Sequence, residues 1–157
     1  MDPQVLVQEL KMSKEFFDRS TRCLEEGHSG VKPAEEMWTA AQQVAHVAQT
    51  VDWFIEGAFR PECFNMDFEG MGADVAKVSS LEVARGWLDR AYSAAMETIG
   101  GKTAEEMFQP LPVDGIMGGA PRLAIVGAIS DHTAHHRGAL TVYSRQAGMT
   151  PKMPYMD

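Results

Sequence analysis

Two histidines four residues apart, in the run DHTAHH from Asp131 to His136, constrain the fold of this chain more than any other feature. They lie in a stretch of helical character that extends from Pro121 to Gln146. Because side chains four apart project from one face of a helix, His132 and His136 are able to reach a single ion. The same face carries apolar residues: Ile125, Ala128, Ile129, Ala139, Leu140 and Tyr143. Imidazoles that face an apolar core are costly to bury without partners, so the pattern predicts a metal-binding helix.

Three further helices are predicted from the spacing of apolar residues and from the residues that begin and end each helix. Asp2-Pro3 is a favourable helix start, and Gly27 is expected to end that helix. Capping-box patterns at 39–42 and 79–82 predict the second and third helices. Residues 57–78 have no sustained period, which predicts a long loop. The chain is therefore expected to be an all-α four-helix bundle with a long loop after the second helix, in a single domain over residues 1–157.

The charge and the cysteine content narrow the class of protein. A formal net charge of −8 discourages binding to nucleic acid or to an anionic membrane, since both need a basic surface. No apolar run has the length of a membrane span, and the first residues lack the pattern of a signal peptide. Two cysteines, Cys23 and Cys63, do not make a disulfide framework. We expect a soluble cytoplasmic protein.

A third candidate ligand is His46, which lies among small apolar residues on the second predicted helix. A lone helical histidine is more often a surface or core residue than a ligand, so its assignment depends on the pair at 132 and 136. Three imidazoles leave at least one coordination position free, which is typical of catalytic rather than structural zinc sites. The spacing alone does not decide between ligands and unrelated histidines.

Five other residues near the motifs have competing interpretations. His135 is rotated about 100° from its neighbour, so it is expected at the surface or behind the ligands. Asp131 either accepts the second N–H of a ligand histidine or is a solvated charge. Arg137 is expected on the exterior, beside an acidic neighbour or a partner subunit. His28 is expected to face solvent, and Cys63 as a nucleophile rests on a single loop cysteine.

Three runs of sequence carry a family resemblance: WTAAQQVAH from Trp38 to His46, HTAHHRG from His132 to Gly138, and SRQAGMTPK from Ser144 to Lys152. They resemble the DinB-like family, damage-inducible four-helix metal proteins that are unrelated to the DNA polymerase of similar name. The resemblance covers nearly the whole chain. It implies a divalent metal ion of the zinc or nickel type, held by His46, His132 and His136. Ala139 departs from the glutamine that many relatives carry, which puts a further polar contact in doubt but not the ligation.

The resemblance also implies chemistry, because characterised branches of the family are transferases and isomerases that use small bacterial thiols. The favoured function is a metal-dependent transferase that activates a low-molecular-weight thiol and acts on a small-molecule substrate. The alternatives are a metal-dependent hydrolase and a non-enzymatic metal-binding stress-response protein. Hydrolysis would require a base near the ion, and the loop candidates are Asp67, Glu69 and Asp114.

The family resemblance implies a homodimer. Exposed apolar residues beside Trp87 and Tyr92 are expected to supply its interface. The chain also has 11 methionines, several of them in predicted loops: Met66, Met71, Met107 and Met117. These either fill gaps or line an adaptable apolar pocket.

Overall fold

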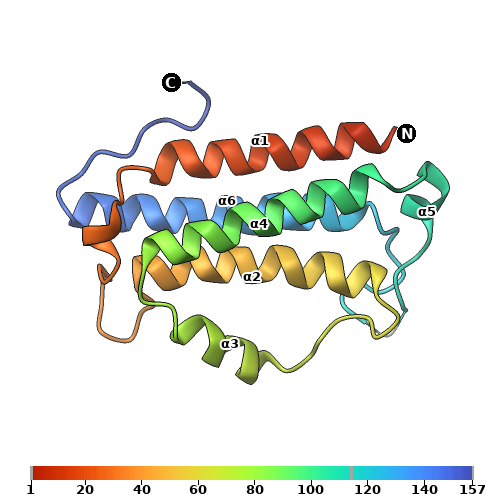
Figure 1. Cartoon of the computed structure of the whole chain (residues 1–157), viewed down its shortest axis with the longest axis horizontal. Coiled ribbons are helices and arrows are strands. Elements are labelled where there is room, and N and C mark those ends of the chain that lie inside the picture. Colours follow the sequence, from red (N-terminus) through yellow and green to blue (C-terminus); the bar gives the residue numbers. More distant parts are fainter. Residues whose placement is uncertain (1, 114, 157) are drawn as a thin grey trace.

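In residues 2–113 and 115–156, which the computed structural model describes, four long helices form a bundle (Figure 1). The long helices are α1 (Pro3–Thr21), α2 (Ala40–Phe59), α4 (Leu81–Gly100) and α6 (Ala124–Gln146). The short ones are a 3₁₀ turn at Glu26–His28, α3 (Phe68–Ala76) and α5 (Ala104–Phe108). The predicted all-α bundle is confirmed. Within the described ranges, strand pairing is limited to an isolated bridge between Pro110 and Pro121.

The direction of the helices follows from the connection between α2 and α4. These two helices run the same way, because residues 60–80 return along the outside of the bundle through α3 (Figure 1). By contrast, α6 runs opposite to α2, and the two helices pack against each other (Figure 1). The contact between α2 and α6 is therefore an antiparallel seam.

The helix starts largely match the predicted caps. The Asp2 side chain accepts the N–H of Gln4, and Thr39 and Gln42 form the reciprocal capping box. The third long helix begins one residue later than the pattern at 79–82 indicated, because Ser80 is its cap. The first helix ends at Thr21 rather than at Gly27, and a 3₁₀ turn follows it.

The prediction of one long loop over residues 57–78 was wrong in part. Helix α2 continues to Phe59, and α3 occupies the second half of the segment. Asp67 starts α3 by accepting the N–H of Gly70. The helix is held on α2 by two side-chain amides: Gln42 donates to the carbonyl of Ala76 at 3.0 Å, and Gln49 donates to that of Met71 at 2.9 Å. Hydrogen bonds from residues distant in sequence thus stabilise α3, whose own sequence has little helical periodicity.

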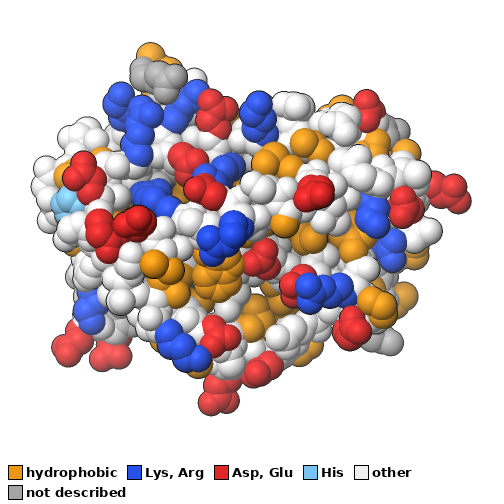
Figure 2. All heavy atoms as spheres, in the orientation of Figure 1, with side chains coloured by type: hydrophobic (Ala, Val, Ile, Leu, Met, Phe, Trp, Pro, Cys, Tyr) orange, Lys and Arg blue, Asp and Glu red, His pale blue; other side chains and the backbone are white. Residues whose placement is uncertain are grey.

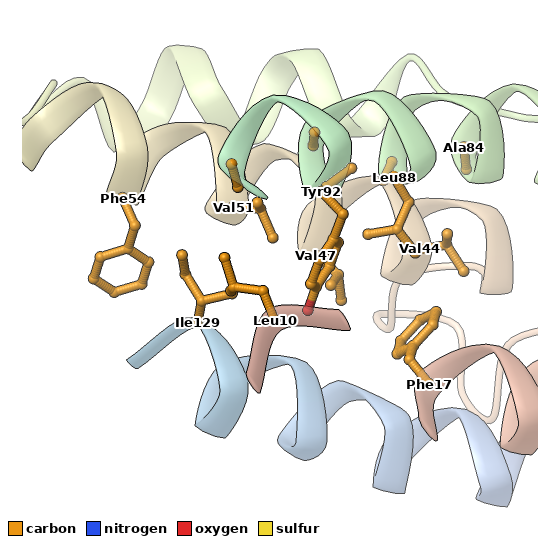
Figure 3. Packing of buried hydrophobic residues seen from close by; sticks show 14 of the residues in the cluster. Leu10, Phe17, Val44, Val47, Val51, Phe54, Ala84, Leu88, Tyr92 and Ile129 are labelled. Atoms are coloured by element: carbon orange, nitrogen blue, oxygen red, sulfur yellow. The ribbon is translucent and has the colours of Figure 1, made fainter. Parts of the chain in front are cut away.

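The core lies between the four long helices. It is built from aliphatic, small and aromatic side chains of all four long helices; the aromatic ones include Phe17 from α1, Phe54 from α2 and Tyr92 from α4 (Figure 3). Leu10, Phe17, Val44 and Leu88 are fully buried there. Burial of such side chains contributes roughly 1.5–3 kcal/mol each to the free energy of folding. The apolar faces expected from helical spacing are the faces that pack.

A hydroxyl cluster crosses this core. The hydroxyl of Tyr92 on α4 lies 2.8 Å from Oγ1 of Thr133 on α6 and 3.1 Å from Oγ of Ser13 on α1. Tyr92 and Thr133 are each 1% exposed. Buried hydroxyls need such partners, so these hydrogen bonds fix the position of α6 relative to α1 and α4.

The two residues that marked the expected dimer surface, Trp87 and Tyr92, are not themselves exposed. Tyr92 is buried, and Trp87 is half-buried with its indole N–H donating to Asp52 at 2.7 Å.

On the face drawn in Figure 2, basic and acidic side chains are interspersed. Among the described residues, no helix combines the length and the apolar character needed to cross a membrane.

Candidate metal centre

The three candidate ligands meet at the seam between α2 and α6. His46 projects from the middle of α2, and His132 and His136 project from successive turns of α6. The imidazole centroid of His46 lies 4.9 Å from that of His132 and 4.8 Å from that of His136. One nitrogen from each ring lies within 4.8 Å of the others. The structure therefore brings His46 together with the pair that sequence spacing singled out.

The distance between two of these nitrogens is close to that of ligands on one ion. Nε2 of His46 and Nε2 of His132 are 3.2 Å apart. Two nitrogens bound tetrahedrally to zinc at 2.0–2.1 Å would be about 3.3 Å apart. Since two lone pairs at this distance repel, the pair requires a proton or a cation between them. A divalent cation would satisfy His136 as well.

Burial keeps the imidazoles neutral, as metal ligation requires. His136 is 8% exposed, and His46 and His132 are half-buried. Burial, with a smaller contribution from the neighbouring imidazoles, lowers the pKa of His132 to about 4 and that of His136 to about 3. The pKa of His46 is also lowered, mainly by burial. At neutral pH all three rings therefore offer a lone pair.

A chain of hydrogen bonds orients His136. Its Nδ1 lies 2.6 Å from Oε1 of Gln43, which can only accept, so Nδ1 carries the proton and Nε2 keeps its lone pair. The amide of Gln43 donates in turn to the hydroxyl of Tyr143 at 3.2 Å. That hydroxyl donates to the backbone carbonyl of Trp38 at 2.7 Å. Outer contacts of this kind hold a ligand histidine in its binding tautomer and orientation.

Sequence reasoning did not identify Gln43 and Tyr143 as part of this arrangement. They are 100 residues apart, and only the packing of α6 against α2 brings them together. One signal was available at Gln43, which precedes His46 by three residues and therefore lies on nearly the same face of the helix. A polar amide at a buried helical position requires a partner.

The rings around the histidines limit access to them. Trp38 lies beside His46, with ring centroids 4.6 Å apart. His135 is exposed and meets His136 edge-on at 4.9 Å, in agreement with its expected place beside the ligands. Asp131 is exposed on α6, as its interpretation as a solvated charge requires. The Arg137 guanidinium lies over the ring of Phe16 on α1, 6.0 Å from its centroid, rather than beside an acidic residue.

The other candidates lie elsewhere or have structural roles. His28 is half-buried, and its Nδ1 accepts the N–H of Glu25, so it stabilises a turn and does not simply face solvent. Cys63 lies in the connector before α3, where its Sγ is 3.7 Å from the carbonyl of Pro61. Asp67 caps α3, and Glu69 is exposed in the first turn of that helix. Asp114, the third base considered for hydrolysis, lies outside the described residues.

The donor set suits a divalent transition metal of borderline softness, such as zinc or nickel, which imidazole nitrogens bind well. Three neutral nitrogens fill three positions and leave room for a further ligand. His46, His132 and His136 are the residues that would hold such an ion.

Comparison with known proteins identifies a family. The sequence model of the DinB family matches residues 3–157, which is nearly the whole chain. A comparison with curated proteins gave no match.

Proposed function

The chain belongs to the DinB family, and we propose that it is a metal-dependent transferase that activates a low-molecular-weight thiol. The observation that carries this proposal is the convergence of three neutral imidazoles from α2 and α6. When bound, a divalent ion of the zinc or nickel type supplies the positive charge that deprotonates a coordinating thiol at neutral pH. We place this chemistry in the cytoplasm, where small thiols are kept reduced.

The residues of the chain have defined parts in this proposal. His46, His132 and His136 bind the ion, and Gln43 holds His136 with Nε2 directed at it. Trp38 covers one side of His46 and restricts water. The thiol of the co-substrate supplies the nucleophile, so the protein does not have to provide a general base. The sulfur then forms a bond to an electrophilic carbon of the second substrate as the bond from that carbon to its leaving group breaks. The leaving group departs with the electron pair of that bond and takes up the proton that the thiol released.

Cobalt substitution tests the proposal. Sulfur ligation to cobalt in the site should add an intense near-ultraviolet charge-transfer band that the thiol-free protein lacks. We expect this band with 2-mercaptoethanol and in the Cys63→Ser variant, because the sulfur comes from the co-substrate. Consumption of an electrophile should then require both thiol and metal. Ester or amide turnover without thiol, and inhibition by thiol, would instead favour a hydrolase. Metal binding without any thiol ligation or turnover would favour a non-enzymatic metal-binding protein.

We further propose that the protein forms a homodimer through the outer face of α1 and the C-terminal segment packed on it. Val5 and Met12 are 59% and 49% exposed and lie two turns apart on α1. Tyr155 contacts Phe16 at 5.1 Å between ring centroids and is itself 67% exposed. Sedimentation should give a species of twice 17.3 kDa, and Met12→Lys should shift it to the monomer.

A further inference from the structure

An apolar surface lies on the outside of the bundle, where the end of α2 meets the connector to α3. It consists of Trp53, Phe64, Met66 and Phe68, and we call it the aromatic shelf. Trp53 lies 4.8 Å from Phe64 and 6.1 Å from Phe68, measured between ring centroids. Met66 and Phe68 are 57% and 54% exposed. Single exposed apolar residues are ordinary, whereas a contiguous group of them marks a binding surface.

The shelf and the histidines share one strip of α2. Trp53 follows His46 by seven residues, which is two helical turns, so the two side chains leave the same face about 10 Å apart along the axis. Helix α3 runs beside this strip: its first residue, Phe68, packs on Trp53, and its Met71 carbonyl accepts the Gln49 amide at 2.9 Å. By helix geometry, a molecule with one end at the histidines would extend about 10 Å along α2, past the Gln49 side chain that is bonded to α3, to reach the shelf.

The connector that carries the shelf is held in place by specific contacts. The indole N–H of Trp53 donates to the carbonyl of Asn65 at 2.7 Å. Phe64 is 8% exposed and packs against Gly57, where a Cβ would overlap its ring. Asp67 then caps α3. These contacts preorganise the shelf, which lowers the entropic cost of binding a ligand there.

A hollow of about 490 Å³ opens at the edge of the shelf, next to Trp53 and Met66. This volume is within the range that small-molecule sites occupy. Two acidic side chains, Glu56 and Glu62, line the hollow. Arg60 is the basic residue of the lining and is paired with Glu56 at 2.8 Å. The rim therefore disfavours an anionic ligand.

We propose that the aromatic shelf binds the uncharged apolar end of the electrophilic substrate, whose reacting end lies at the three histidines. This inference rests on the proposed function, which supplies the claim that the electrophilic end of the substrate reacts at the histidines. It specifies the substrate class as a neutral molecule with an aromatic or alkyl group about 10 Å from its reacting atom. The shelf recognises that group by burying it, and the acidic rim discriminates against carboxylated analogues.

Two hydroxamates, which bind divalent ions without any thiol, test the shelf by calorimetry on the zinc-loaded full chain. Acetohydroxamate occupies only the metal, whereas 6-phenylhexanohydroxamate also places a phenyl group at the distance of the shelf. We expect the phenyl compound to bind about tenfold more tightly, from the apolar area that it buries. A carboxylate on its ring should remove the gain.

Phe68→Ser should abolish the gain from the phenyl group without changing the affinity for acetohydroxamate. Phe108→Ser is the matched control, because Phe108 is a phenylalanine of similar exposure, 57%, at the end of α5. Its substitution should leave the gain intact.

Equal affinity for the two hydroxamates would overturn the inference, as would a gain that Phe68→Ser does not reduce or a failure of both compounds to bind. Failure of the thiol proposal has a different signature. In that case the cobalt protein lacks the sulfur band, while the hydroxamate gain and its loss in Phe68→Ser persist.

Discussion

Two buried polar clusters join α6 to the rest of the bundle, and they differ in how their hydrogen bonds end. The closed cluster consists of Tyr92, Ser13 and Thr133, whose hydroxyls satisfy one another. The histidine cluster consists of Gln43, Tyr143, His136, His46 and His132. Its hydrogen bonds run through Gln43 to His136 and leave imidazole lone pairs directed at a common point. A buried group without a partner is costly, so the first cluster serves stability, whereas the second could hold a metal ion.

Of the substitutions that test this difference, removal of one histidine ligand should have the largest effect on zinc affinity. His132→Ala leaves two imidazoles, so we expect the affinity for zinc to fall by at least about 100-fold and the purified protein to lose its metal. Metal analysis and a competitive zinc titration measure this. His135→Ala and His28→Ala are the controls and should bind one ion per chain as the wild type does. Full metal content in His132→Ala would contradict the three-histidine site.

Acid should affect the histidine cluster and leave the closed cluster unchanged. In the unfolded chain a histidine protonates near pH 6.5, whereas in the fold the pKa is about 4 for His132 and about 3 for His136. The unfolded state therefore binds more protons between these values. The free energy of unfolding of the apoprotein should therefore have its full value above pH 6.5. It should fall as the pH decreases from 6.5 toward 4.

Urea unfolding of the apoprotein across this pH range measures that loss. Bound metal should also be released in the same direction, since protons compete for the imidazoles. His132→Ala should show a weaker pH dependence of unfolding, whereas an identical dependence in the variant would argue against the buried neutral His132.

Gln43→Leu removes the acceptor for His136 without removing a ligand. We expect zinc affinity to fall by about 10- to 100-fold, because the ring loses the contact that fixes its tautomer and orientation. Gln49→Leu is the matched control: Gln49 is a glutamine on the same helix that bonds α3 instead of a histidine. Equal zinc affinities of the two variants would show that Gln43 has no orienting role.

Tyr92→Phe breaks the closed cluster and should have the smallest effect on metal binding. Loss of the hydroxyl leaves Thr133 and Ser13 without this partner, which should destabilise the fold by about 1–2 kcal/mol. Urea unfolding of the apoprotein measures the change in stability. Zinc affinity should stay within about twofold of the wild type, although Thr133 is adjacent to His132. A loss of affinity as large as that in Gln43→Leu would mean that the two clusters are not separable.

The sequence predicted the parts of the fold and site that depend on local spacing. The four long helices follow from apolar periodicity and from caps such as Asp2 and Thr39. His132 and His136, four residues apart, share a face in any regular helix. His46 was a candidate on its own helix, and the family resemblance supported its assignment.

The features that the sequence did not predict depend on contacts between distant residues. Helix α3 contains Gly70 and Gly72, which weaken a helical pattern, and it is held by amides of α2. An exposed apolar patch was expected beside Tyr92, which is itself buried and follows the buried Leu88 by one turn. The hydrogen bond from Gln43 to Tyr143 joins residues that only the packed bundle brings together.

X-ray absorption at the zinc edge tests the central claim most directly, because it counts the ligands of the ion. The zinc-loaded protein should give three imidazole nitrogens at about 2.0–2.1 Å and one further light ligand. Addition of a small thiol should replace that ligand with one sulfur at about 2.3 Å, in the wild type and in Cys63→Ser alike. Fewer than three imidazoles, or a sulfur that is present without added thiol and lost in Cys63→Ser, would contradict a three-histidine centre with a free position for substrate.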